Sequence, residues 1–191
     1  VYQDNEGNGI CIADGSRFGL SDNECLNTKI YNIIIQECGN NGLAIIDDVK
    51  WVFSFNNITI KTCGNIGFLD RSSDNNYYGF NISHCENLGM YAEGSRNRYT
   101  TFKVFVCGIN HKKAEVSAGE AGQTVTRPDG MYWQGVRVKG RHMSFVGFDI
   151  QECGAELLYV EMNASNNYIQ ATLDRSGFGA VNGVSTVLEY S

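Results

Sequence analysis

The fold is decided by the stretch Asn57-Ile58-Thr59-Ile60-Lys61-Thr62-Cys63-Gly64, because this phrase recurs along the chain. It is repeated at residues 32–39 (NIIIQECG) and 81–87 (NISHCEN), and more loosely at 104–108 (VFVCG) and 148–154 (FDIQECG). The cysteines of these copies are 25, 22, 22 and 46 residues apart, and the last spacing is close to two periods of 23. A second phrase keeps step with the first, at residues 73–77 (SDNNY), 95–99 (SRNRY) and 165–168 (SNNY).

A period of 22–25 residues with alternating apolar residues in each unit predicts a parallel β-solenoid with one coil per repeat. Leucine-rich repeats have a similar period, but they require a leucine ladder that this chain lacks, and no unit offers an amphipathic helix. We therefore expect an all-β parallel β-helix of about six to seven coils.

Each repeat has a side that should face the bore of the helix. The residues three and five positions before the cysteine are apolar, as with Ile58 and Ile60 before Cys63, and alternation along a strand turns both toward one face. Asp70 falls at an inward position of the following strand, which leaves the register of its coil open. The second strand of successive coils is expected to begin at Gly42, Gly67, Gly89 and Gly130.

Five of the seven cysteines occupy the same inward position: Cys38, Cys63, Cys85, Cys107 and Cys153. Parallel stacking brings neighbouring Cα atoms within disulfide range but aligns the Cβ vectors instead of aiming them at each other. Zinc binding would require closely spaced Cys or His pairs, and none accompanies these cysteines. We therefore expect reduced thiols packed in the core, assembled in a reducing compartment, with no metal site and no cofactor.

The 191 residues are expected to form a single β-helix segment over residues 1–191. Since the chain begins at Val1 without a methionine, we expect it to be part of a longer chain. The long interval between Cys107 and Cys153 predicts an inserted loop within one coil, over residues 109–129, which includes the only proline, Pro128.

Charge and hydropathy exclude several partners. The formal net charge is −6 and the pI is near 5.0, which argues against a nucleic-acid binder, since that would require a basic stripe. No apolar run approaches the 18 or more residues of a membrane-spanning helix, so no membrane insertion is expected.

Two outward positions of the second strand carry the residue types of a carbohydrate groove. Aromatic rings stack on sugars, and flanking polar groups bind hydroxyls. The predicted substrate-binding residues are Arg71, Tyr91, Tyr132, Gln134 and Tyr159. Stacked outward tyrosines also occur as plain β-ladders, so the pattern allows a purely structural interpretation as well.

Glu93 and Glu161 are the candidate catalytic residues. If the coils stay stacked across the inserted loop, these glutamates lie two rungs apart, roughly 9–10 Å, which is near the upper end of the separation in an inverting carboxylate pair. Both could equally be ordinary residues on the solvent side.

The phrases at residues 57–64 and 73–77 resemble the coils of the pectate-lyase-like superfamily, right-handed parallel β-helices, and most of all those of bacteriophage tailspikes and preneck appendages. This resemblance implies a virion protein, usually a homotrimer, that binds or cleaves a bacterial surface polysaccharide. It is a resemblance of coil architecture: the calcium-binding aspartates and catalytic arginine of pectate lyases have no clear counterpart in this chain.

Two other functions stay open on the sequence. One is a free-standing bacterial polysaccharide lyase or hydrolase, secreted or held at the cell surface. The other is a non-catalytic structural or adhesive rod, because a fold of this kind does not by itself imply an activity.

Overall fold

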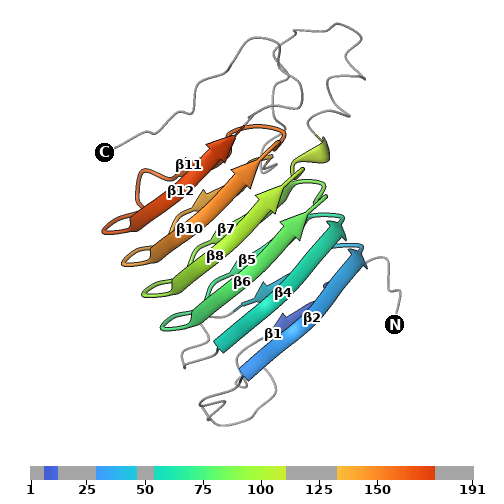
Figure 1. Ribbon diagram of the computed structural model, residues 1–191, viewed down its shortest axis with the longest axis horizontal. Coiled ribbons are helices and arrows are strands. Elements are labelled where there is room, and N and C mark those ends of the chain that lie inside the picture. The colour runs from blue at the N-terminus through green and yellow to red at the C-terminus, as the bar shows by residue number, and fades with distance from the viewer. Residues whose placement is uncertain (1–6, 13–28, 47–53, 111–132, 175–191) are drawn as a thin grey trace, which may run out of the picture.

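The computed structural model describes residues 7–12, 29–46, 54–110 and 133–174, which form a parallel β-solenoid with two sheets (Figure 1). The first sheet contains the short strands β1 (Ile10–Ile12), β3 (Leu43–Ile45), β5 (Ile66–Asp70), β7 (Leu88–Ala92), β9 (Val136–Val138) and β11 (Leu158–Val160). The second contains the long strands β2 (Lys29–Cys38), β4 (Ser54–Cys63), β6 (Asn76–Ser83), β8 (Arg98–Phe105), β10 (Ser144–Gln151) and β12 (Tyr168–Asp174).

Successive coils contribute one strand to each sheet, and every strand pairing described is parallel. Figure 1 shows the strands as rungs that run from blue at the N-terminal end to red at the C-terminal end. From β2 to β12 the described residues complete about five turns, so the predicted solenoid is confirmed and the predicted coil number is approximate.

The coil with the long cysteine spacing is a single turn, because β8 pairs directly with β10. Nearly all of the predicted inserted loop at 109–129 lies outside the described residues. In the part of the chain that the structure describes, no helix has the length and apolar character needed to cross a membrane.

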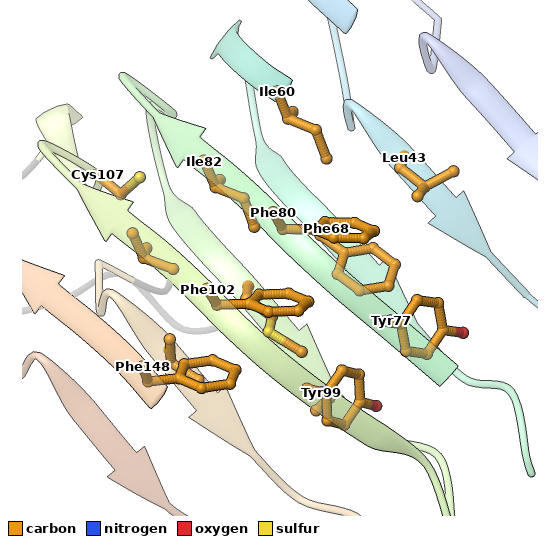
Figure 2. Close-up of a cluster of buried hydrophobic side chains, with 14 of the residues drawn as sticks. Leu43, Ile60, Phe68, Tyr77, Phe80, Ile82, Tyr99, Phe102, Cys107 and Phe148 are labelled. Atoms are coloured by element: carbon orange, nitrogen blue, oxygen red, sulfur yellow. The ribbon is translucent and has the colours of Figure 1, made fainter. Parts of the chain in front are cut away.

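The bore is filled by aromatic and aliphatic side chains that repeat from coil to coil. Phe80, Phe102 and Phe148 form a continuous stack, with ring centroids 4.6 Å and 4.8 Å apart (Figure 2). A second row continues from Tyr77 to Tyr99 at 5.1 Å. These contacts confirm that the residues before each cysteine face inward, and they supply the apolar burial that stabilises the rod.

The cysteine ladder is confirmed as a row of buried free thiols: Cys38, Cys63, Cys85, Cys107 and Cys153. Each of these sulfurs lies within hydrogen-bonding distance of the carbonyl oxygen two residues earlier, for example Cys107 Sγ and Phe105 O at 3.5 Å. The thiols are therefore satisfied locally, inside the same strand that positions them.

Glycines at the start of the short strands pack against the cysteine sulfurs: Gly9, Gly42, Gly67, Gly89 and Gly135. The last of these corrects the predicted register of one coil. Met90 pairs with Val136, so the second strand of that coil begins after Gly135 and the prediction of Gly130 is wrong. A Cβ on Gly135 would lie 2.6 Å from Ile150 Cγ2 and 2.7 Å from the carbonyl oxygen of Leu157. Only glycine fits where the short strand passes this close to the next coil.

The register left open at Asp70 is now defined. Asp70 pairs with Ile45 on one side and Ala92 on the other, so it does point into the bore, where it is fully buried. Its carboxylate accepts hydrogen bonds from the backbone N–H and the hydroxyl of Ser72, from Asn97 Nδ2 at 3.0 Å and from Tyr99 Oη at 2.7 Å. The inward carboxylate is thus the centre of a buried hydrogen-bond network at the corner of the coil.

The long strands also bend at a repeated bulge that the sequence analysis missed. The pairing skips one residue in the middle of each long strand from β2 to β10, and each skipped residue has a positive φ. The skipped residues are Asn32, Asn57, Gly79, Thr101 and Gly147. Four of these five are Asn or Gly, the residues that tolerate the left-handed region best.

Candidate functional site

The corrected register changes both outward rows of the short sheet. Arg137 pairs with Tyr91 and Tyr159, and Lys139 follows two residues later on the same face. The tyrosine row therefore consists of Leu69, Tyr91, Arg137 and Tyr159, and the charged row consists of Arg71, Glu93, Lys139 and Glu161.

Two predicted site residues do not belong to these rows. Gln134 lies before Gly135 and is fully buried, with its Nε2 donating to Glu156 Oε2 at 3.0 Å. It is placed for structural packing, because a fully buried amide cannot contact a sugar. Tyr132 lies outside the described residues, and its predicted position beside Tyr91 is occupied by Arg137.

Tyr91 is not an open stacking platform. Only 6% of the residue is exposed, and its hydroxyl donates to Glu161 Oε1 at 3.0 Å. Burial and the neighbouring carboxylates of Glu93 and Glu161 raise the pKa of the phenol, so it stays protonated. The Arg137 guanidinium lies 5.5 Å from the centroid of the Tyr91 ring and 5.0 Å from that of Tyr159, so a cation separates the two rings.

Glu161 is held by the same arginine. Its Oε1 accepts a hydrogen bond from Arg137 Nε at 2.7 Å as well as the one from Tyr91. The side chains of Glu161 and Arg137 are each only 16% exposed, so the pair is largely shielded from water. Glu161 therefore fixes Arg137 between the two rings.

Glu93 lies between two cations. Arg71 Nε lies 2.6 Å from Glu93 Oε2, and Lys139 Nζ lies 2.9 Å from Glu93 Oε1. Burial disfavours the charged carboxylate, but the hydrogen bonds and charges of Lys139 and Arg71 outweigh burial and hold the pKa of Glu93 below its usual range. Glu93 is therefore ionised at neutral pH, which makes it a poor proton donor.

A pocket of about 550 Å³ opens beside the charged row, at the end of the short strands. Its volume falls within the range of small-molecule sites. It is lined by polar and charged groups from four successive coils, which are Arg71, Ser73, Glu93, Gly94, Ser95, Lys139, Gly140, Arg141 and Asn163. We call it the charged pocket.

The residues that follow the short strands build the far wall of the charged pocket. Ser95 forms parallel bridges with Ser73 on one side and Arg141 on the other, and the two serine hydroxyls lie 2.9 Å apart. Arg141 is exposed, and its side chain forms no hydrogen bond or ion pair with any described residue. Among the described residues, Arg141 thus adds an unpaired cationic side chain to the wall that contains Ser73 and Ser95.

Sequence reasoning identified Arg71 and Glu93 but missed Ser73, Ser95 and Arg141. A signal for them was present. The phrase that begins SDN and SRN repeats at the coil corner, and Arg141 takes the position of its serine in the coil between the copies at 95–99 and 165–168.

The described residues offer no metal centre: among them, no three His, Cys, Asp or Glu side chains come together in a way that could hold an ion. Hydroxyls, one carboxylate and several cations are the chemistry of the charged pocket, and these groups can bind a polar ligand by hydrogen bonds and charge.

The described residues define a parallel β-solenoid with a polar pocket on its side. Comparison with protein-family models, curated proteins and solved structures finds no match to the chain.

Proposed function

We propose that this chain is a polysaccharide-binding β-helix whose glycan site is the charged pocket. The observation that carries the proposal is the lining of that pocket, where Ser95, Asn163 and charged side chains surround one concave volume of about 550 Å³. A sugar presents hydroxyls that both donate and accept, and this lining offers matching acceptors and donors.

The direction of the pocket also suits a linear polymer. Its lining comes from four successive coils, which at a strand spacing of about 4.8 Å extend roughly 14 Å along the rod axis. Because the described lining spans several coils, a linear polymer can lie along the rod and contact more than one coil at a time.

The resemblance of the repeat to tailspikes and preneck appendages supports the biological setting that we propose. In that setting the chain is part of a homotrimeric virion appendage that contacts the polysaccharide of a bacterial surface. The fold agrees with that setting, since a parallel β-solenoid is the scaffold that such appendages use.

We propose binding ahead of cleavage because of the state of the two candidate catalytic glutamates. An inverting pair needs one protonated and one ionised carboxyl group. Here Glu93 is ionised between Arg71 and Lys139, and Glu161 is bonded to Arg137 and Tyr91. Both are positioned as partners for neighbouring cations, and a catalytic role for them stays a prediction.

The proposal is tested with the full chain on an array of bacterial surface polysaccharides. Asn163 is exposed and lines the pocket, so Asn163→Trp fills the pocket with little effect on the core. The matched control is Asn81→Trp, at another exposed asparagine, on the opposite sheet. We expect the wild type and the control to bind the same glycans, and the pocket variant to lose them.

Two results would contradict the proposal. If no polysaccharide binds to the wild type, the chain is a structural rod. If Asn163→Trp binds as tightly as the control, glycan recognition takes place elsewhere on the surface. Measurement of released reducing ends and of ultraviolet-absorbing products in the same experiment separates binding from hydrolase or lyase activity.

A further inference from the structure

We infer that the charged pocket selects a glycan with an acidic group, a carboxylate or a phosphate, and that Arg141 is the residue that binds this group. The inference rests on the proposed glycan binding and adds the class of sugar to it. It follows from the balance of charge in the pocket and from the bonding of each cation there.

The balance of charge in the pocket is opposite to that of the chain. The chain carries a net charge of −6, whereas the described residues that line the pocket contribute three cationic side chains and one carboxylate. The cations are Arg71, Lys139 and Arg141, and the carboxylate is that of Glu93. A local excess of positive charge on an acidic protein attracts anionic ligands to this place.

The three cations differ in availability. Arg71 and Lys139 both bond to Glu93, at 2.6 Å and 2.9 Å, so a ligand anion would compete with that carboxylate for them. Arg141 is exposed and has no such partner among the described residues. An incoming anion can therefore reach Arg141 without breaking an existing ion pair.

The surroundings of Arg141 favour an anion in this position. Glu93 would repel an anion, but its charge is offset by the two cations that hold it. The guanidinium can bind a carboxylate or a phosphate through two parallel hydrogen bonds, which a neutral hydroxyl cannot match. The hydroxyl of Ser95 and the amide of Asn163 line the same pocket and can bind the remaining hydroxyls of the sugar.

The test uses glycans that differ only in their acidic groups. Each polysaccharide that binds the wild type is measured again after reduction of its carboxyl groups to alcohols, and separately after removal of its phosphates with hydrofluoric acid. We expect one of these treatments to weaken binding at least tenfold. Arg141→Gln should weaken binding of the untreated glycan by a similar factor, while the control Lys61→Gln, an exposed lysine on the opposite sheet, should not.

The outcomes separate this inference from the function on which it rests. If untreated and treated glycans bind equally well and Arg141→Gln has no effect, the acidic specificity is wrong while glycan binding stands. If the treatments weaken binding but Arg141→Gln does not, the anion site lies at another residue and the role of Arg141 is wrong. If no glycan binds to the wild type, both proposals fail.

Discussion

The phenol of Tyr99 donates a 2.7 Å hydrogen bond to the carboxylate of Asp70 inside the bore, although the two residues are 29 positions apart in the chain. Asn97 donates to the same carboxylate oxygen at 3.0 Å. Each donor comes from the coil after that of Asp70, so the hydrogen bonds join two successive coils at a corner that is lined by polar groups. Fully connected, such a network favours one register of stacking over its alternatives.

Replacement of Asp70 by Ala should therefore destabilise the fold strongly. The change would remove the acceptor of the buried Tyr99 hydroxyl and one of the acceptors of Asn97 Nδ2, at a cost of about 2–4 kcal/mol in the free energy of unfolding. Urea denaturation followed by circular dichroism measures it. The matched control is Asp149→Ala, which removes a partly exposed aspartate whose ion pair with Lys103 is 3.9 Å long and should cost less than about 1 kcal/mol. An equal loss of unfolding free energy in the two variants would contradict the role of Asp70 as the central acceptor of the buried hydrogen-bond network.

The same residue predicts a dependence of stability on pH. Burial raises the pKa of Asp70 above its ordinary value of 3.8, and hydrogen bonds from Ser72 and Tyr99 oppose that rise only in part. Between 3.8 and the raised value, the folded protein retains a proton that the unfolded chain has released. The contribution of Asp70 to stability should therefore fall as the pH rises through this window. Asp70→Asn should flatten the slope there, and an unchanged slope would contradict the assignment.

A Cβ on Gly135 has no room, so Gly135→Ala should destabilise the chain. The added atom would lie 2.6 Å from Ile150 Cγ2 and 2.7 Å from a backbone oxygen, and the backbone cannot move without disturbing the next rung. We expect a loss of about 1–3 kcal/mol in thermal or urea unfolding. In the control Gly147→Asn, the nearest atom to the new Cβ is 3.7 Å away, so only the positive φ acts against the side chain, and since asparagine tolerates that φ better than most residues the loss should be smaller than for Gly135→Ala. A neutral Gly135→Ala would refute the register that places Gly135 against the next coil.

The sequence was sufficient to predict the bore but not the whole site, and Gly135 shows why. Inward positions such as Ile60 follow from alternation within a repeat, which needs only local counting. The outward rows depend on the register across the long coil, where the phrases at 130–133 and 135–138 both read as glycine, apolar, any, apolar. Counting back from the next cysteine resolves the choice: Gly67, Gly89 and Gly135 each lie 18 residues before one.

The ion-pair partners of Glu93 could not be predicted from the sequence either. Glu93 was recognised as an outward carboxylate, but whether it is free or held depends on which side chain stands on the neighbouring rung. In the observed register Lys139, and not Gln134, lies beside Glu93. The charged row therefore alternates in sign, and Glu93 pairs with Arg71 and Lys139. The physical meaning of the row changes from a hydrogen-bonding surface to an ion-pair ladder beside a pocket.

Thr101 has the left-handed conformation at the bulge where the other coils use asparagine or glycine, so Thr101→Asn should stabilise the protein. Its φ is 59°, a value that crowds a β-branched side chain. We expect a gain of about 0.5–1 kcal/mol in the free energy of unfolding. The neighbouring Thr100→Asn is the control, because Thr100 has no such φ and asparagine is a poorer strand former than threonine. A gain in both variants would point to a cause other than backbone strain.

The cysteine ladder predicts an order of thiol reactivity. Cys11 is exposed, whereas Cys107 is fully buried, and burial raises the pKa of its thiol. Since the thiolate is the reactive form, iodoacetamide should modify Cys11 in the native protein within minutes and Cys107 only after denaturation. Mass spectrometry of the digested protein after timed labelling measures both sites at once. Native labelling of Cys107 at the rate of Cys11, or recovery of the ladder as disulfides, would contradict the packing of the thiols in the bore.

Glu93→Gln should make the protein less stable at neutral pH and less sensitive to acid. Since the pKa of Glu93 is held below its ordinary value of 4.5 by Lys139 and Arg71, the charged carboxylate stabilises the folded state above that value. This contribution is lost as the pH falls through the lowered pKa, and there the two proteins should converge. The cationic partners are 51% and 41% exposed, which limits the loss at pH 7 to about 1 kcal/mol. Urea unfolding at a series of pH values measures it.

The same variant separates the two roles considered for Glu93. The substitution removes the one carboxylate among the described lining residues and leaves Arg71 and Lys139 without their shared partner, so the pocket becomes more positive. If Glu93 acts only to organise these cations, the affinity for an acidic polysaccharide should rise about threefold to tenfold, with the gain lost at high salt. If Glu93 is instead a catalytic carboxylate, any release of reducing ends by the wild type should vanish in the variant. Calorimetric titration alongside a reducing-end assay distinguishes these results, and Glu156→Gln, outside the pocket, is the matched control.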